Sequence, residues 1–468
     1  MLNDFLILMR AELVVTLLIF LLLFIKLGRA RSNNLVLSVT YLLLIVHAII
    51  ALLGEQDGML FADMFVSNKL IVLQKVMLSL ATLLLLLLNH DWLKKHAHLP
   101  EFLMLLFSAL LGMYLMISSG NLIIFYLALE LSSIPVAAMA NFDLEKKRSS
   151  EAAMKMILSS AFSSGVLLFG ISLLYGSTGT ISFSTMATLV QGNALEITGF
   201  LLFFAGIAFK LSVVPFHFWT ADVYEGAPVV VTSFLSVVSK GSIAFVLITL
   251  LYKVFESFGP NVYRLLEMLA VATLLVGNLF ALRQKNLKRF LAFSSVAQVG
   301  FILVGVSSLS AAGTAAVTYF ILVYIFSNLA AFGVISIISE ATGKENIEDY
   351  KGLYQNNKML SWVMAIALFS LAGIPPTAGF FGKLFLIMAG AGTVNASVGF
   401  ISLVAMNLVL SLYYYLRVVR AIFMETNDHP MQQVPVQAAP RVGLMICTVA
   451  IVVVGLIGWI YEYIKSLS

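Results

Sequence analysis

The chain has 468 residues, of which 61% are hydrophobic and only 11% are charged. A soluble domain carries about 25% charged residues, so this composition excludes an ordinary water-soluble globule and indicates a chain whose surface faces lipid. The single cysteine, Cys447, excludes an intrachain disulfide and a four-cysteine iron–sulfur site. It lies in an apolar run, and we expect it to be a small buried residue.

Fourteen apolar runs are long enough for helices that cross a hydrocarbon layer of about 30 Å, which takes about 20 residues. In chain order they lie near 11–27, 35–53, 70–88, 101–118, 121–140, 151–175, 196–214, 227–254, 264–282, 288–307, 313–339, 360–391, 398–422 and 441–464. The twelfth run is the least regular. We therefore predict an all-α polytopic membrane protein with 14 transmembrane helices.

The basic residues alternate from loop to loop. Odd-numbered loops hold most of the 28 lysines and arginines, beginning with Lys26, Arg29 and Arg31 in the first loop. Cytoplasmic loops of membrane proteins are enriched in lysine and arginine. We therefore expect the odd loops to face the cytoplasm and both termini to lie on the outer, periplasmic side.

An internal repeat links spans 4–8 to spans 9–13. The matches are, in order, Asn121-Leu122 with Asn286-Leu287, Phe169-Gly170 with Phe332-Gly333, and Phe209 to Pro215 with Phe369 to Pro375. Their offsets are nearly constant, and five spans is an odd number, so the second copy is inverted relative to the first. Inverted repeats are typical of transporters. The predicted units are an N-terminal three-helix segment (1–100), a first repeat (101–260), a second repeat (261–424) and a C-terminal loop with helix 14 (425–468).

Prolines interrupt the equivalent spans 7 and 12. Pro215, and Pro375 with Pro376, lack a backbone donor and break the helix. Carbonyl groups freed at such breaks are tolerated in a membrane only where they face protein or a water-filled cavity. The two broken helices therefore predict where a hydrated path runs.

Ionisable residues inside the predicted spans are the candidate functional residues, because burying one at mid-bilayer costs about 3 kcal/mol or more. Glu130 is central in span 5 and Lys240 in span 8, while Lys210 and Lys383 lie beside the two breaks. A lysine whose carboxylate partner moves away changes its proton affinity. We expect Glu130 to pair with Lys210 and the lysines to form a gated proton wire.

Two further residues are weaker candidates. Lys155 lies near one end of span 6, where it is suited either to the path or to snorkelling toward the membrane edge. His217 follows the first break and is either a proton relay or a capping residue in a loop. The sequence predicts no cofactor-binding residue and no metal ligand in this chain, and no nucleic-acid-binding pattern is present.

Two motifs carry a family resemblance. Residues 209–228, Phe-Lys-Leu-Ser-Val-Val-Pro-Phe-His-Phe-Trp-Thr-Ala-Asp-Val-Tyr-Glu-Gly-Ala-Pro, resemble the signature of the antiporter-like subunits of respiratory complex I. The same fold occurs in multisubunit sodium/proton antiporters and membrane-bound hydrogenases. Residues 371–383, Leu-Ala-Gly-Ile-Pro-Pro-Thr-Ala-Gly-Phe-Phe-Gly-Lys, look like the span-12 signature of one branch, the N-type subunits.

The resemblance implies a proton-translocating subunit of NADH-quinone oxidoreductase, driven by quinone reduction elsewhere in the complex. It also implies that a hydrophilic axis runs along the membrane arm through Glu130, Lys210, Lys240 and Lys383, with Lys155 as the span-6 lysine. It also implies that NADH, FMN, iron–sulfur clusters and quinone bind to other subunits. The expected partners are other membrane-arm subunits and the lipid bilayer, and the expected location is a bacterial inner membrane.

Two alternatives remain open at this point. The first is a subunit of a multisubunit sodium/proton antiporter, which shares the lysine row. The second is a structural membrane-arm subunit whose buried charges do not pump. Association with a flavin and iron–sulfur arm would favour the NADH-quinone oxidoreductase subunit over the antiporter subunit. Normal proton pumping after loss of Lys210 and Lys240 would favour the structural subunit.

Overall fold

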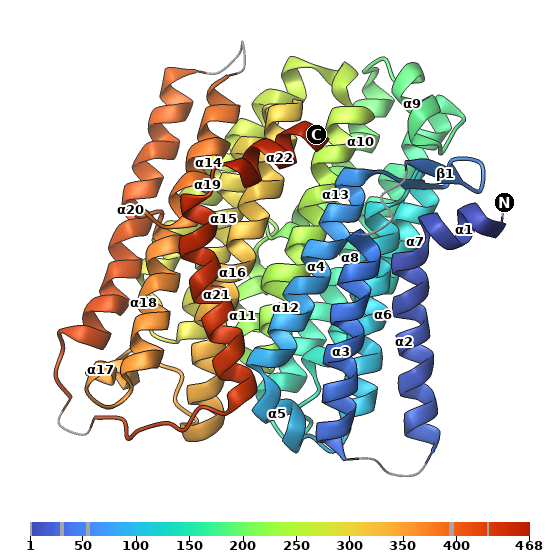
Figure 1. Ribbon diagram of the computed structural model, residues 1–468. Helices are drawn as coiled ribbons and strands as arrows, with labels where there is room; N and C mark the ends of the chain where they lie inside the picture. Colours follow the sequence, from blue (N-terminus) through green and yellow to red (C-terminus); the bar gives the residue numbers. More distant parts are fainter. Residues whose placement is uncertain (1, 29–31, 53–56, 393–396, 428–429) are drawn as a thin grey trace.

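Long helices make up most of the chain in the computed structural model, which describes all residues except 1, 29–31, 53–56, 393–396 and 428–429. Arg29 and Arg31 of the first predicted loop lie outside the described residues. Figure 1 shows the helices side by side in one bundle, with both termini at the same end.

The first half contains α1 (Leu2–Leu8), α2 (Arg10–Leu27), α3 (Asn33–Leu52), α4 (Lys69–Leu88), α5 (His90–Lys95), α6 (Leu99–Ile117), α7 (Leu122–Ala140), α8 (Lys147–Thr178), α9 (Phe183–Leu189), α10 (Ala194–Leu211), α11 (Phe218–Gly226), α12 (Val229–Phe234), the π-helical turn η1 (Leu235–Ser239) and α13 (Lys240–Lys253). A short hairpin pairs β1 (Gly58–Leu60) with β2 (Phe65–Ser67) antiparallel.

The second half contains the 3-10 turn η2 (Glu256–Phe258), α14 (Pro260–Leu282), α15 (Leu287–Val306), α16 (Ala311–Thr342), the 3-10 turn η3 (Ile347–Tyr350), α17 (Leu353–Asn356), α18 (Lys358–Ala372), α19 (Ala378–Ala391), α20 (Val398–Phe423), α21 (Ala438–Leu456) and α22 (Trp459–Leu467). Side-chain caps begin several of these helices: the oxygens of Asn121 and Asn286 accept from the first-turn N–H groups of α7 and α15.

Among the described residues, twelve helices are long and apolar enough to cross a membrane. The helix α2 has the length, but it carries three charged residues, Arg10, Glu12 and Lys26. The helices α18 and α19 are shorter and are separated by a break at 373–377. The chain is therefore a polytopic all-α membrane protein, as predicted, and most helix bounds fall within a few residues of the predicted runs.

The predicted span at 441–464 is wrong in its second half. The helix α21 ends at Leu456 because Ile457 leaves the helical conformation, with φ −100° and ψ 96°. The separate helix α22 follows, with Glu462 and Lys465 among aromatic residues and only Ile464 buried. Such an amphipathic segment suits a membrane interface rather than the hydrocarbon layer. The sequence did not reveal the end of α21, because the apolar run continues across it.

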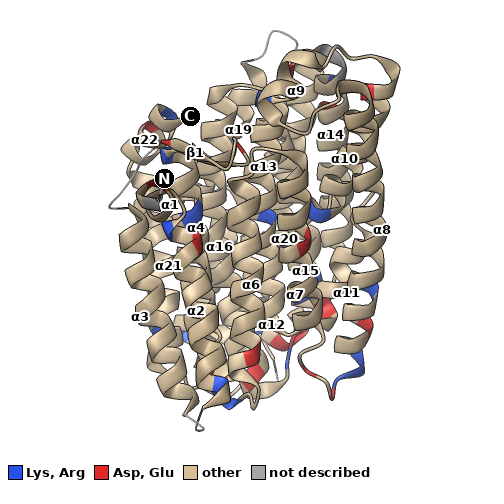
Figure 2. Ribbon diagram, turned by 90° about the vertical axis from the view of Figure 1, so that its right-hand side faces the viewer, with Lys and Arg blue, Asp and Glu red and all other residues tan. Residues whose placement is uncertain are grey.

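The odd-numbered loops gather at one end of the bundle. Lys26 forms an ion pair with Glu101 at the start of α6. Lys95 pairs with Glu340 of α16 at 2.9 Å, and Arg417 donates to the carbonyl oxygen of Gln284 at 2.9 Å. Figure 2 shows charged residues at this end, others at the opposite end near α1, α9 and α22, and a few at mid-height, with long charge-free stretches of helix between them.

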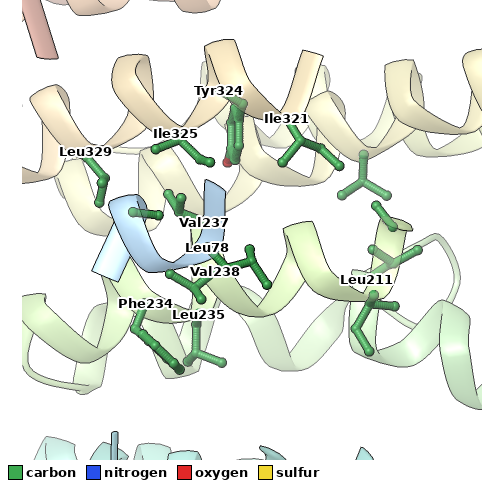
Figure 3. Packing of buried hydrophobic residues seen from close by; sticks show 14 of the residues in the cluster. Leu78, Leu211, Phe234, Leu235, Val237, Val238, Ile321, Tyr324, Ile325 and Leu329 are labelled. Atoms are coloured by element: carbon green, nitrogen blue, oxygen red, sulfur yellow. The ribbon is translucent and has the colours of Figure 1, made fainter. Parts of the chain in front are cut away.

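The centre of the bundle is formed by α13, α15 and α16, which are almost entirely buried. Figure 3 shows Leu78 of α4, Val237 and Val238 of η1, and Tyr324 of α16 packed together there. Polar groups in this region therefore lie in apolar surroundings. Cys447 is also buried, as predicted.

Candidate functional site

Lys210 lies in the last turn of α10, next to the first break. The helix ends because Ser212 adopts the left-handed conformation (φ +69°) and Pro215 follows without an N–H to donate. The Lys210 ammonium donates to the hydroxyl oxygens of Ser133 on α7, at 2.7 Å, and Ser160 on α8, at 2.5 Å. Three helices therefore contribute to holding this one charge.

Glu130 does not pair directly with Lys210, contrary to our expectation. In the described part of the chain, no lysine, arginine or histidine nitrogen lies within the 4.0 Å ion-pair distance of its carboxylate. Its Oε1 atom is buried without a hydrogen-bond partner. Ser133, one turn further along α7, accepts from Lys210 instead. The structure therefore shows no direct contact between Glu130 and Lys210 among the described residues.

A small cavity leads from Lys210 toward the turn that precedes Lys240. It has about 20 Å³ of water-accessible space, and its lining includes Ser133, Ser160, Lys210 and Ser239. A space of roughly 10–15 Å³ is enough for one water molecule. The polar lining and the volume therefore fit about one ordered water beside Lys210.

Lys240 begins α13 directly after the π-helical turn η1 and is 3% exposed. Such turns are rare and frequently occur at functional sites. Its ammonium donates to the Ser295 hydroxyl of α15 at 2.8 Å and lies 5.5 Å from the centre of the Tyr224 ring. Nearby, Ser236 of η1 and the Tyr324 hydroxyl share a hydrogen bond of 3.0 Å. Lys240 thus joins the first broken helix to α15.

Lys383 lies on α19, just after the second break. The helix α18 ends at Ala372, and Gly373 adopts φ +86°. The ammonium donates to the carbonyl oxygens of Leu371, at 2.7 Å, and Ala372, at 3.2 Å. It also lies 4.7 Å from the Phe301 ring centre. The freed carbonyls and the negative end of the α18 dipole stabilise the cation.

Gln298 shares an acceptor with Lys383. Its Nε2 donates to the Leu371 carbonyl oxygen and to the Tyr415 hydroxyl, each at 3.0 Å. Ser295, the acceptor of Lys240, lies one turn earlier on the same face of α15. Neither Ser295 nor Gln298 was predicted from the sequence, although polar residues three apart in an otherwise apolar helix were the signal available.

His217 lies at the start of α11, immediately after the first break, and is buried. Its Nδ1 atom has no hydrogen-bond partner among the described residues. Its ring centre is 6.5 Å from that of Phe280. The structure therefore provides a buried ring nitrogen here but no hydrogen bond from it to a lysine.

Lys155 does not join the buried row. Its ammonium is 2.8 Å from carboxylate oxygens of both Glu151 and Asp222, and its side chain is 44% exposed. Asp222 also accepts from Arg289 at 2.7 Å, and Arg289 contacts Glu225 at 3.0 Å. This polar cluster lies at the surface, so the structure separates Lys155 from Lys210, Lys240 and Lys383.

Two further lysines are buried outside the row. Lys288 is 5% exposed and contacts Glu345 at 3.2 Å. Lys75 is buried and contacts Glu12 at 2.6 Å. Glu12 is therefore a second acid within the helical bundle, besides Glu130.

The fold and these contacts define a class: polytopic membrane proteins with buried lysines, held by hydroxyl and carbonyl groups, beside broken helices. The family model described as NADH:quinone oxidoreductase/Mrp antiporter, TM, matches residues 119–411. The chain belongs to this NADH:quinone oxidoreductase/Mrp antiporter family.

Relatives and solved structures agree with this assignment. NADH-quinone oxidoreductase subunit N of Azobacteroides pseudotrichonymphae is 46% identical over 88% of this chain and 86% of its own length. The protein of the same name from Phocaeicola vulgatus is 42% identical over 98% of each chain. A chain of respiratory complex I from Thermus thermophilus superposes with a TM-score of 0.84 at 26% identity, covering 98% of this chain and 100% of its own.

The fold also extends to a second kind of assembly. A chain of the Mrp complex from Dietzia sp. superposes with a TM-score of 0.85 at 20% identity, covering 98% of this chain and 96% of its own. At this identity the likeness concerns the fold alone.

Proposed function

We propose that this chain is the proton-translocating, antiporter-like membrane subunit of an NADH-quinone oxidoreductase. The observation that carries the proposal is the pair of polar groups on buried α15: Ser295 accepts from Lys240, and Gln298, one turn further, shares the Leu371 carbonyl oxygen with Lys383. Ionisable residues are costly within a membrane and mark ion pathways. The relatives named NADH-quinone oxidoreductase subunit N support the same activity.

Each predicted residue has a proposed role in this path. Lys210 receives protons near the first break, under the field of Glu130, and passes them by way of water to Lys240. Lys240 is the central carrier, and Lys383 is the last one before release. His217 relays protons beside the first break. Lys155, in its surface cluster with Asp222, is the proposed collecting group at the entrance.

The finer architecture is part of the proposal: fourteen spans, with spans 4–8 repeated as 9–13 in inverted orientation. Adding α2 and the broken pair α18–α19 to the twelve apolar helices gives this number. The repeat is supported by matching hydrogen bonds: Leu122 N–H to Ile181 O, and Leu287 N–H to Glu345 O. The helices α8 and α16 support it too, since each has 32 residues and ends at a left-handed glycine.

The units follow from this repeat. We assign a three-helix segment to 1–100, the first repeat to 101–260, the inverted repeat to 261–424, and a C-terminal loop with the last helix to 425–468. Helix α14, which begins at Pro260, agrees with the middle boundary. The basic loops at one end of the bundle support a cytoplasmic location for that end and a periplasmic one for both termini, in a bacterial inner membrane.

The redox chemistry belongs to other subunits in this proposal. NADH, FMN, the iron–sulfur clusters and quinone bind elsewhere in the complex, and this chain contacts neighbouring membrane-arm subunits and lipid. The buried thiol of Cys447 is the only one in the sequence, which agrees with a chain that carries no cluster.

The proposal is tested with Lys240→Ala in the intact complex. We expect NADH-driven proton uptake by inverted membrane vesicles to fall by about tenfold or more, with assembly unchanged on a native gel. Lys344→Ala, at an exposed lysine in a loop, is the matched control and should pump normally.

Two results would contradict the proposal. Proton movement that follows a sodium gradient, in a purified assembly without flavin or iron–sulfur centres, would favour a sodium/proton antiporter. A normal proton-to-electron ratio after Lys210→Ala and Lys240→Ala together would favour a structural subunit.

A further inference from the structure

A second buried ion pair lies outside the lysine row. Lys75 of α4 is 2.6 Å from Glu12 of α2, and their side chains are only 2% and 3% exposed. Both precede the segment that matches the family model, residues 119–411. Removing two charges from water costs several kcal/mol each, and replacing such a pair with apolar residues is often neutral or stabilising. Stability alone is therefore a poor explanation for the pair.

The pair adjoins a chain of hydrogen-bonding side chains from three helices. The Ser79 hydroxyl donates to the Lys75 carbonyl oxygen at 2.9 Å and shares a second, short hydrogen bond with the Tyr114 hydroxyl. The Tyr114 hydroxyl is 3.2 Å from the His47 Nε2 atom, and the two rings are stacked. These groups extend from the backbone of Lys75 on α4 to α6 and α3.

Several buried polar atoms in this cluster lack a hydrogen-bond partner. Neither carboxylate oxygen of Glu12 makes a hydrogen bond of good geometry, despite the short contact to Lys75. The His47 Nδ1 and Gln74 Nε2 atoms are likewise without partners among the described residues. Buried polar atoms are nearly always paired with protein or ordered water, so this set fits bound water and mobile protons.

Helix α4 connects the cluster to Lys240. Leu78, between Lys75 and Ser79, packs against Val237 and Val238 of the turn that precedes Lys240, as Figure 3 shows. A Cβ atom built on Gly241 would be 3.6 Å from the Leu78 side chain. Leu78 itself is fully buried. Leu78 thus packs against the backbone on both sides of Lys240.

We propose that Glu12, Lys75 and the Ser79–Tyr114–His47 chain form a second proton-binding site, which exchanges protons with the Lys240 region past Leu78. In its working step the Lys75 ammonium gives one proton to the Glu12 carboxylate. One N–H bond breaks and one O–H bond forms, which leaves a neutral amine and a neutral acid. Glu12 lies in the first turn of α2 and Lys75 in the first two turns of α4, and both helices begin toward the end of the bundle that carries the N-terminus (Figure 1), so the site links Lys240 to that face. This inference rests on the proposed function.

The test uses Glu12→Gln with Lys75→Gln in the intact complex. The double variant leaves no unpaired charge, so a merely structural pair predicts normal assembly and normal pumping. We expect normal assembly on a native gel but proton uptake lowered by about tenfold, because both proton-carrying groups are lost. Glu12→Asp should retain most of the activity. Normal uptake in the double variant would overturn the proposal.

If the double variant does not assemble, a second variant tests the proposed proton-binding site. Tyr114→Phe removes only a hydroxyl group, and we expect it to assemble and to lower proton uptake. Wild-type uptake by Tyr114→Phe would then refute the site. Thr82→Val is the matched control, because the Thr82 hydroxyl donates only to its own helix, at Leu78 O, and this variant should pump normally.

Lys240→Ala in the same preparation separates the two proposals. If Lys240→Ala abolishes uptake while the double variant and Tyr114→Phe leave it intact, only the second site is refuted. If Lys240→Ala also pumps normally, the proposed function itself fails.

Discussion

Gln298 and Lys383 donate to the same acceptor, the carbonyl oxygen of Leu371, at 3.0 and 2.7 Å. This oxygen is available because α18 stops at Ala372, so the last turn of the helix has unsatisfied carbonyl groups. The break in the helix therefore creates a shared acceptor between α15 and α19. The arrangement places the Lys383 ammonium beside Gln298. Gln298 in turn lies one turn from Ser295, which accepts from Lys240.

The first prediction concerns Gln298→Leu, which keeps the volume and removes the amide. Losing a hydrogen bond worth about 0.5–1.5 kcal/mol should slow proton transfer by about two- to tenfold. The measurement is NADH-driven proton uptake by inverted vesicles. Tyr415→Phe removes the other Gln298 acceptor but keeps the Leu371 contact, so it should pump nearly normally. Equal rates in Gln298→Leu and wild type would show that this link is not used.

Much of the fold could be predicted from the sequence, because helices in a membrane must satisfy their own backbone groups and be apolar along their length. The run at 121–140 predicts α7 closely, and Asn121 marks its start. The prolines of the two breaks were equally visible. The end of α21 at Leu456 was not, since composition does not change there.

The site could be predicted only in part. Lys240 and Lys383 stood out because charge is rare in apolar runs, whereas Ser160 and Gln298 are ordinary residues whose importance comes from the helix opposite. The sequence of a single span does not indicate which other helices it packs against. The burial of Lys75 was not predicted for the same reason: its partner Glu12 is 63 positions away in the sequence.

The second prediction concerns the glycine at the second break. Gly373→Ala forces a side chain into the left-handed conformation, which costs roughly 1–2 kcal/mol, and the new Cβ would lie 3.2 Å from Lys383 Cδ. We expect lower thermal stability of the complex and reduced proton uptake. Gly343→Ala has the same conformational cost (φ +70°) but no atom within 4 Å, so it should lose stability alone. Equal pumping by the two variants would contradict the proposed positioning of Lys383.

The third prediction concerns the serines around Lys210. Ser160→Ala removes one hydrogen bond to a charged donor, worth about 1.5–3 kcal/mol, and should slow proton uptake by about tenfold or more. Its neighbour Ser159 donates to carbonyl oxygens of its own helix, so Ser159→Ala is the matched control and should pump normally. An unchanged rate in Ser160→Ala would mean that Ser133 alone is sufficient to hold the ammonium.

The fourth prediction is a pH dependence in the loop between α4 and α6. His96 packs between Trp92 and Phe142, each ring centre 4.7 Å away, and this burial lowers its pKa below the usual 6.5, although nearby Asp143 and Glu101 oppose the shift. When the loop opens and exposes His96, the pKa of this residue returns to about 6.5. Between the lowered pKa of the packed loop and 6.5, the open loop therefore binds more protons than the packed loop.

The packed form should therefore be most stable above pH 6.5 and lose stability as the pH falls through the lowered pKa of His96. Hydrogen exchange of residues 90–98, corrected for the intrinsic pH effect, should become faster in this window. His96→Phe keeps an aromatic ring without a titrating group and should abolish the response. His98→Asn, at a side chain that is 59% exposed, should leave it in place. A pH response that survives in His96→Phe would assign it to Asp91 or His90, whose pKa values are also shifted by burial.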